Sequence, residues 1–215
     1  MGKLTRKDNE EDIYLMMNKP AGLITARSDE NEKTIFDIIP DTLKEKYTLF
    51  PVGRLDKDTE GLILITNDGL FNHKVIHKDS GVKKVYRFFS LGEIDKKKVK
   101  KAQTGLELSD AKDKVKTKPF KIKKINSWHY KDAIRVLPDV SFSRIKKKQK
   151  DDSIVTYGEI TLYEGKKHEV KRILKELGCY VVYLKRIQIG KVKLDDKLKL
   201  GDLRDLTKKE VKSFK

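Results

Sequence analysis

The chain has 215 residues and a formal net charge of +17, with 39% charged and 37% hydrophobic residues. This apolar content is enough for one good-sized core or two small ones beneath a heavily charged surface, which excludes disorder throughout. A single cysteine, Cys179, excludes an internal disulfide and an all-cysteine metal site. Because the sequence has neither a secretory leader nor an apolar run long enough to cross a bilayer, we expect a cytoplasmic protein.

The positive charge makes a polyanion the leading partner. Lysine far outnumbers arginine among the 50 basic residues, which favours diffuse attraction to phosphates over bidentate reading of bases. Charge alone leaves RNA, DNA and an anionic membrane surface open as partners. Only the motifs of the chain can distinguish these partners.

The amino-terminal part predicts a tail, a strand and a short helix. Residues 1–11 are polar and charged, so we expect a flexible tail. The apolar run 13–17 predicts a strand that ends in the turn Asn18-Lys19-Pro20-Ala21-Gly22. Thr34 is placed to cap a short helix over 35–39, and a second helical turn is expected over 41–46.

A loop with three carboxylates precedes the most apolar strand of the chain. Asp56, Asp58 and Glu60 stand beside Arg54 and Lys57, and the loop runs into the apolar residues 62–65. A buried strand fixes the loop that precedes it. The sequence therefore predicts an anchored carboxylate in a cationic setting, which is what a catalytic acid requires.

A helix and a strand are expected next. Asp68 is placed to cap a helix over 69–76, and residues 81–89 predict a strand with basic residues at its start. Lys84 and Tyr86 are two residues apart, so their side chains point the same way in an extended strand.

Short strands and a solvated helix are expected in the middle of the chain. Residues 94–103 predict the helix, and Trp128 is expected to close a hairpin. The charge run 144–152 predicts a flexible loop, with RNA contact and mere solvation given equal weight. The expected strands cover residues 106–108, 120–125, 133–137 and 153–162.

A basic helix is predicted after Gly165. Its apolar positions fall at helical spacing, and it ends at Gly178. Basic and imidazole side chains crowd its first turns, where the helix amino terminus adds positive potential. The apolar positions are Val170, Ile173, Leu174 and Leu177.

The histidines predict no metal site. His73 and His77 are four residues apart and can share a helix face, but no third ligand is evident nearby. His168-Glu169 resembles the start of a zinc-protease helix, yet Arg172 stands where the second histidine is needed.

Four motifs in order resemble the pseudouridine synthases that modify ribosomal RNA, and most closely their RsuA-type branch, which acts on the small subunit. The resemblance extends from about Tyr14 to the end of the chain. It implies an α+β fold built on a mostly antiparallel mixed sheet with flanking helices and a central cleft. The motifs are Asn18-Lys19-Pro20-Ala21-Gly22, Gly53-Arg54-Leu55-Asp56, Lys84-Val85-Tyr86 and Glu164-Gly165 with Val170-Lys171-Arg172.

The resemblance also implies roles for individual residues. Asp56 is the essential catalytic carboxylate, Lys171 pairs with it, and Tyr86 packs against the target base beside Val170. Arg54 fills the gap left by the everted uridine, or instead pairs with Asp58 or Glu60, and the two readings have equal weight. Glu169 stands where the family has glutamine and receives no binding role. The expected RNA contacts are Arg54, Lys19, Lys84, Lys166, Lys167 and Arg172.

Such a reaction requires no cofactor, because uridine and pseudouridine are isomers. The carboxylate can add to C1′ of the sugar, stabilise a cationic sugar, or remove a proton from C2′, and the sequence leaves all three open. Asp58 and Glu60 can in principle form the acid pair of a glycoside hydrolase, but pairing within the loop is favoured.

The expected organisation is a tail over 1–11 and a catalytic domain over 12–215, with no room for the amino-terminal S4 module of many relatives. The expected partner is ribosomal RNA or a ribosomal assembly particle, and the protein is expected to be a monomer that binds no membrane. Two alternatives remain. One is a sister synthase acting on large-subunit ribosomal RNA, and the other is a non-catalytic RNA-binding assembly factor.

Overall fold

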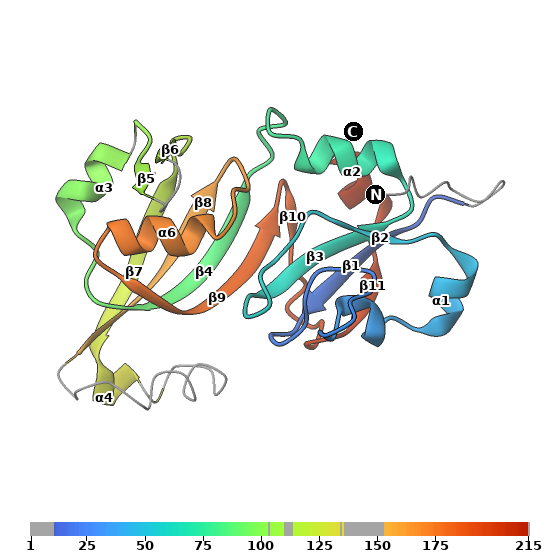
Figure 1. Ribbon diagram of the computed structural model, residues 1–215, viewed down its shortest axis with the longest axis horizontal. Helices are drawn as coiled ribbons and strands as arrows, with labels where there is room; N and C mark the ends of the chain where they lie inside the picture. The colour runs from blue at the N-terminus through green and yellow to red at the C-terminus, as the bar shows by residue number, and fades with distance from the viewer. Residues whose placement is uncertain (1–10, 103, 110–113, 134, 136–152, 215) are drawn as a thin grey trace. The chain divides into compact units, whose positions relative to one another are not determined.

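The chain forms two compact units. A computed structural model describes residues 11–102, 104–109, 114–133, 135 and 153–214. The first unit contains the described residues up to Val82 and those from Arg186 onward, and the second contains Lys83–Lys185. Each unit combines antiparallel strands with short helices (Figure 1). The expected tail lies outside the described residues except for Glu11.

The first unit is organised around a fully buried strand. Strand β1 (Tyr14–Lys19) lies between β11 (Leu203–Asp205) and β3 (Glu60–Thr66), and both pairings are antiparallel. All seven residues of β3 are buried, because the strand is apolar from Leu62 to Ile65 and packed on both faces. The short β2 (Phe50–Val52) also pairs with β3, which places both ends of the Asp56 loop on one strand pair.

The helices of this unit begin where the sequence places their caps. Thr34 Oγ1 accepts a hydrogen bond from Phe36 N, and Asp68 Oδ1 accepts from Leu70 N and Phe71 N. Both predicted caps are confirmed. The helical elements are the 3-10 helix η1 (Ile35–Ile38), α1 (Asp41–Lys46), α2 (Gly69–Ile76) and α7 (Lys208–Lys212). Phe71 and Val75 of α2 belong to a core that Val211 of α7 packs against, formed by Met16, Val52, Leu62, Leu64, Phe71, Val75, Ile189, Val192 and Leu206.

The second unit contains a three-strand antiparallel arrangement. Strand β8 (Ile154–Leu162) pairs with β4 (Lys84–Leu91) on one side and β7 (Lys121–His129) on the other. Strands β5 (Glu107–Ser109) and β6 (Lys114–Lys116) form a separate hairpin. Strand β9 (Tyr180–Ile189) begins in this unit and ends in the first, where β10 (Val192–Lys193) pairs with it.

Helix α6 (Glu169–Glu176) is the basic helix that the sequence predicts. Val170, Ile173 and Leu174 are buried, because their spacing places them on one face of the helix. The other helices of this unit are α3 (Lys96–Ala102) and α4 (Tyr130–Ala133). No helix of the described part is both long enough and apolar enough to span a membrane.

Two expectations in the middle of the chain are wrong. Trp128 does not close a hairpin but continues β7, opposite Val155 of β8. The polar residues around it are tolerated because β7 is an edge strand among the described residues and pairs with β8 alone. Ala133 ends helix α4 instead of beginning a strand. The remainder of 133–137, apart from Arg135, and the charge run 144–152 lie outside the described residues.

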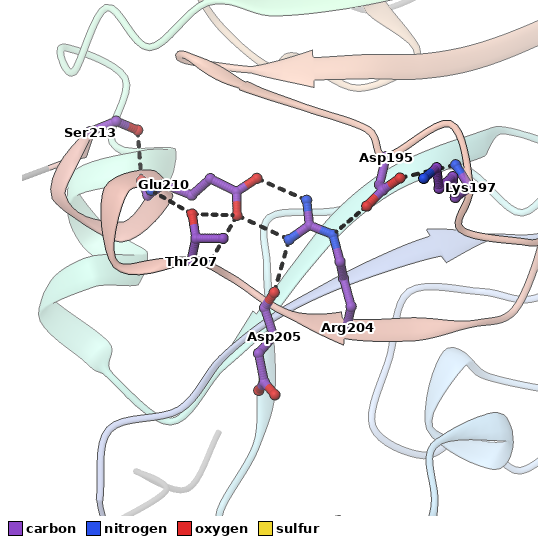
Figure 2. A network of polar contacts seen from close by, with 7 residues as sticks. All are labelled: Asp195, Lys197, Arg204, Asp205, Thr207, Glu210 and Ser213. Atoms are coloured by element: carbon purple, nitrogen blue, oxygen red, sulfur yellow. Dashed lines mark hydrogen bonds and ion pairs between the residues drawn. The ribbon is translucent and has the colours of Figure 1, made fainter.

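A polar network anchors the carboxy-terminal elements of the first unit (Figure 2). Arg204 of β11 donates two hydrogen bonds to the carboxylate of Glu210 in α7, at 2.8 and 2.9 Å, and a third to Asp195 at 2.9 Å. Glu210 also accepts from the backbone and hydroxyl of Thr207, which caps α7. The hydrogen bonds from Arg204 first, and then those from Thr207, outweigh burial and lower the pKa of Glu210 to about 2.

We predict that Glu210→Gln lowers the free energy of unfolding by about 1–2 kcal/mol at pH 7, since the partly exposed pair is screened by solvent. The folded-state pKa lies below the ordinary value. The contribution is therefore present above about pH 4.5 and is lost as the pH falls toward 2. Urea unfolding at several pH values measures this. Asp202→Asn is the control, because it also removes one negative charge but at an exposed position nearby. It should leave the free energy of unfolding unchanged. An equal loss of stability in both variants would contradict the prediction.

Candidate active site

The backbone of the Asp56 loop is fixed by a tight turn. Thr59 N donates to Asp56 O at 3.0 Å, which closes the turn between β2 and β3. Leu55 is buried on one side of Asp56, whereas the Asp56 side chain is half-exposed. The loop thus holds a carboxylate at the surface on an anchored backbone.

A buried lysine provides the main anchor. Lys19, the last residue of β1, has no exposed surface. Its Nζ donates to the carbonyl oxygens of Pro20 at 2.9 Å, Asp56 at 3.2 Å, Lys57 at 3.3 Å and Thr59 at 3.0 Å. One ammonium therefore joins three carbonyls of the Asp56 loop to one of the preceding turn, and the carbonyls of Asp56 and Lys57 also accept from backbone amides.

Burial outweighs the effect of the charges around Lys19 on its pKa. Burial lowers the pKa of Lys19 to about 8, against the opposing effect of Asp58, Asp56 and Glu60. The buried guanidinium of Arg186 also lowers this pKa, and its Nε donates to Leu62 O at 2.7 Å. At neutral pH the ammonium is still mainly protonated, as its four acceptors require. The cationic setting that the sequence predicts for the loop is thus supplied in the first unit by Lys19 and Arg186.

Two further residues tie the loop down, and sequence reasoning missed both as anchors. The hydroxyl of Thr25 donates to Leu55 O at 2.9 Å and accepts from Leu55 N at 3.1 Å. Gly22 N donates to Lys57 O at 2.8 Å, from a turn in which Gly22 has a φ of +95°. The turn after Lys19 was recognisable from Pro20 and Gly22, but no local signal marks Thr25.

The structure corrects two predicted RNA contacts. Lys19 is wrong as a phosphate contact, because its ammonium is enclosed by loop carbonyls. Lys84 is also a poor candidate for a phosphate contact, because only 8% of the residue is exposed in β4. In both cases a strand places the basic side chain inside the fold, and the linear sequence does not distinguish such a cation from one that faces solvent.

The second unit carries the other predicted site residues. Tyr86 lies in β4 and is 9% exposed, and Val170 is 5% exposed in α6. Lys171 and Arg172 follow Val170 and are half-exposed, while Lys167 is exposed in the loop before the helix. These residues are thus carried by one strand and one helix terminus.

The Lys166 ammonium is bound by other residues of the second unit. Its Nζ lies 2.8 Å from Glu164 Oε2 and donates to Lys116 O at 2.7 Å. An ammonium held by two acceptors is a weaker candidate for a phosphate contact than the exposed Lys167.

The remaining charges of the Asp56 loop differ in exposure. Arg54 is exposed, and Lys57 forms an ion pair with Glu32. Glu60 is buried at 4% exposure as the first residue of β3. The half-exposed Asp56 and Asp58 are therefore the carboxylates of this loop that a substrate can reach.

No group of three or more histidine, cysteine, aspartate or glutamate side chains suited to a metal lies within the described ranges. The rings of His73 and His77 are 4.6 Å apart on α2, as their spacing predicts.

Comparisons with known proteins agree with this arrangement. The family model described as RNA pseudouridylate synthase matches residues 13–176. The chain belongs to the RNA pseudouridylate synthase family. It is therefore a pseudouridine synthase, and the reading as a non-catalytic RNA-binding protein is not supported.

Relatives of this synthase are named for both ribosomal subunits. An uncharacterized RNA pseudouridine synthase of Bacillus subtilis is 35% identical over 95% of this chain and 74% of its own length. A ribosomal large subunit pseudouridine synthase B of the same species is 32% identical, over 97% and 73%. A ribosomal small subunit pseudouridine synthase A of Vibrio parahaemolyticus is also 32% identical, over 93% and 73%. The RsuA-type branch is therefore not decided by similarity.

The fold of the synthase is the one that the sequence predicts. A crystal structure of a pseudouridylate synthase aligns with a TM-score of 0.71 and 30% identity, over 95% of this chain and 74% of the other. The expected α+β fold with a mixed, mostly antiparallel sheet is confirmed.

We predict that Lys19→Met lowers the free energy of unfolding by about 2–4 kcal/mol, because it removes the buried ammonium that joins the carbonyls of Pro20, Asp56, Lys57 and Thr59. Urea unfolding measures the loss, and hydrogen exchange at the Asp56–Thr59 amides should rise more than elsewhere. Lys191→Met, at an exposed turn of the same unit, is the matched control. Equal stability of the two variants would show that the carbonyl cluster does not depend on Lys19.

We also predict that Thr25→Val lowers pseudouridine formation by about 10-fold or more, since Val keeps the volume but removes the hydroxyl that holds Leu55 next to Asp56. Thr25→Ser keeps the hydroxyl and should retain most of the activity. Single-turnover rates of pseudouridine formation, on an RNA that the unsubstituted protein modifies, measure the activity of both variants. A similar loss in the two would assign the effect to the methyl group and to packing.

Proposed function

We propose that this synthase converts a specific uridine of ribosomal RNA into pseudouridine and that Asp56 is the carboxylate that acts at the sugar. The observation that carries the proposal is the anchoring of the Asp56 backbone by Lys19 and Thr25 while its side chain stays half-exposed. A fixed carboxylate that a nucleotide can reach is what the reaction requires. The ribosomal names of two relatives support the class of RNA.

The chemistry has a simple balance. The bond from N1 of uracil to C1′ of ribose breaks, the detached base turns, and C5 forms a new bond to C1′. The proton on C5 then leaves, and N1 ends protonated. Nothing is oxidised or reduced, so the protein has only to position the sugar, retain the base and move one proton.

Asp56 can promote the first step in three ways. Its carboxylate can bond to C1′, stabilise the positive charge that develops on the sugar, or take the proton from C2′. All three require the carboxylate to lie close to the sugar.

The motifs shared with the family support roles for three further residues. We assign Lys171 to an ion pair with Asp56 that fixes the carboxylate, and Tyr86 to stacking on the uracil and relay of the C5 proton. Val170, the buried neighbour of Lys171, provides apolar surface for the base. These roles follow from the motif that the residues share with the family.

Binding the RNA requires both attraction and eversion of the uridine. Exposed Lys167 and half-exposed Arg172 are the proposed phosphate contacts at the start of α6. Arg54 is the proposed side chain that enters the stack when the uridine leaves it, which its exposure two residues before Asp56 favours.

The small ribosomal subunit is the proposed source of the substrate, on the motif resemblance to the RsuA-type branch. A second candidate is large-subunit ribosomal RNA, since the large-subunit synthase of Bacillus subtilis is as similar to this chain as the small-subunit synthase of Vibrio. Mapping pseudouridine by carbodiimide treatment and primer extension on ribosomal RNA from cells lacking the protein distinguishes them. Loss of a small-subunit stop supports the first candidate, and loss of a large-subunit stop supports the second. No lost position in either RNA would overturn both.

We predict that Asp56→Asn folds, binds RNA with undiminished dependence on salt, and forms no detectable pseudouridine, because the amide can neither bond to C1′ nor stabilise its charge. Expressing the variant in the deletion strain and repeating the map measures activity. Asp58→Asn is the matched control, a half-exposed carboxylate two residues away with the same change in charge. Modification restored by Asp56→Asn but not by Asp58→Asn would move the catalytic role to Asp58.

A further inference from the structure

Two carboxyl groups at the start of α6 share one lysine. Glu169 is the first residue of the helix and is 4% exposed, and the Glu164 side chain is 10% exposed in the loop that precedes it. Lys166 binds both, since its Nζ lies 2.8 Å from Glu164 Oε2 and its backbone N donates to Glu169 Oε2. Two ionised carboxylates brought together where little solvent reaches repel each other, so a proton on one of them is favoured.

The surrounding donors show where this proton resides. Glu164 Oε1 accepts from Lys118 N at 2.5 Å, and Glu164 Oε2 lies 2.8 Å from Lys166 Nζ. Glu169 Oε2 accepts from Lys166 N at 3.0 Å. The fourth oxygen, Glu169 Oε1, is buried and receives no donor from the described residues. A proton on Glu169 Oε1 that is donated to Glu164 satisfies all four oxygens.

We propose that Glu169 acts as a positioning residue in its acid form, donating a proton from Oε1 to Glu164 and thereby holding the first turn of α6, which carries Lys171. This inference rests on the proposed function, in which Lys171 fixes the catalytic carboxylate. It explains why a glutamate can occupy the position where the resemblance expects glutamine. A protonated carboxyl, like an amide, offers one donor and one acceptor.

The charges that face Glu169 agree with this assignment. Burial first, and then the hydrogen bond to Glu164, raise the pKa of Glu169 to about 7, while Lys166 opposes the rise. Burial also acts to raise the pKa of Glu164, but hydrogen bonds from the Lys166 side chain, the Lys118 backbone and Glu169 bring it below its ordinary value. Of the two groups, Glu169 therefore keeps its proton to the higher pH and loses it as the pH rises through about 7.

The pair connects three segments of the second unit. Glu164 receives the backbone of Lys118, and Lys166 reaches back to Lys116 O at 2.7 Å, so residues 116–118 are joined to the loop before α6. Glu169 joins that loop to the helix through Lys166 N. Between them stands His168, a non-glycine residue in left-handed backbone with a φ of +51°, which requires support from its surroundings.

Loss of the proton would place two carboxylates against each other in a buried site. Their repulsion would open the loop and release the first turn of α6. Because the folded-state pKa of Glu169 lies above the ordinary value, its stabilising effect is complete below about pH 4.5 and is lost as the pH rises through about 7. Activity should therefore fall on the alkaline side through kcat, with little change in KM.

The experiment compares the full-length chain with Glu169→Gln, Glu169→Ala and the control Glu107→Gln. Glu107 is an exposed glutamate of the same unit, in β5. Single-turnover pseudouridine formation is followed from pH 6 to 8.5. If the rate follows the protonated fraction, the unsubstituted protein and Glu107→Gln should lose up to about 30-fold across this range. Glu169→Gln, with a permanent donor, should change by less than about 3-fold, and Glu169→Ala should be slow at every pH.

Two measurements do not depend on activity. Carbon-13 NMR of carboxyl-labelled glutamate should show one side chain that titrates near pH 7 and whose signal is absent from Glu169→Gln. Hydrogen exchange at the amides of 169–173 should accelerate with pH in the unsubstituted protein more than in Glu169→Gln, after correction for intrinsic exchange.

The outcomes separate this inference from the proposed function. An ordinary titration of Glu169, or the same alkaline loss of rate in Glu169→Gln as in the unsubstituted protein, would overturn the positioning role. If no RNA is modified at any pH while the NMR and exchange results are as expected, the proposed function fails and the proton-bearing anchor of α6 stands. If the rates agree but exchange at 169–173 does not respond to pH, Glu169 does not act by holding the helix.

Discussion

The structure of the Asp56 loop depends chiefly on one buried ammonium. Lys19 has no exposed surface, and it donates to carbonyls on both sides of the turn that carries Asp56. Backbone carbonyls buried without donors are costly, so the loop cannot leave this position without also leaving Lys19 unpaired. Lys19 thereby links strand β1 to the loop. The backbone that carries the half-exposed Asp56 carboxylate is held in place by the sheet.

The basic residues of this protein fall into two groups, one exposed to solvent and one buried or internally paired. Most of the charge lies on exposed lysines, which attract a polyanion without specific geometry. A smaller group is buried or internally paired and organises the fold. Lys19 and Arg186 support the Asp56 loop, Arg204 joins β11 to α7, and Lys166 stabilises the loop before α6. A motif rich in lysine and arginine can therefore contain cations that organise the fold as well as exposed cations.

Carboxyl groups show the complementary pattern. Glu210 is held ionised by Arg204, and its pKa falls, whereas Glu169 is enclosed beside Glu164, and its pKa rises. The difference arises from the neighbour each group meets and not from its residue type. In the same protein the pKa of one glutamate thus lies well below its ordinary value and that of another lies above it.

The sequence by itself determined the family, the Asp56 motif, the buried strand β3, the caps Thr34 and Asp68, and the apolar face of α6, because each is encoded by residues close together in the chain. Only the tertiary structure decided that Lys19 faces inward, that Thr25 holds Leu55, that Trp128 continues β7, and that Glu169 meets Glu164. These facts depend on which strand or loop packs against a residue from elsewhere in the chain. No local pattern carries that information, since an identical lysine or glutamate is equally suited to solvent until a neighbour encloses it.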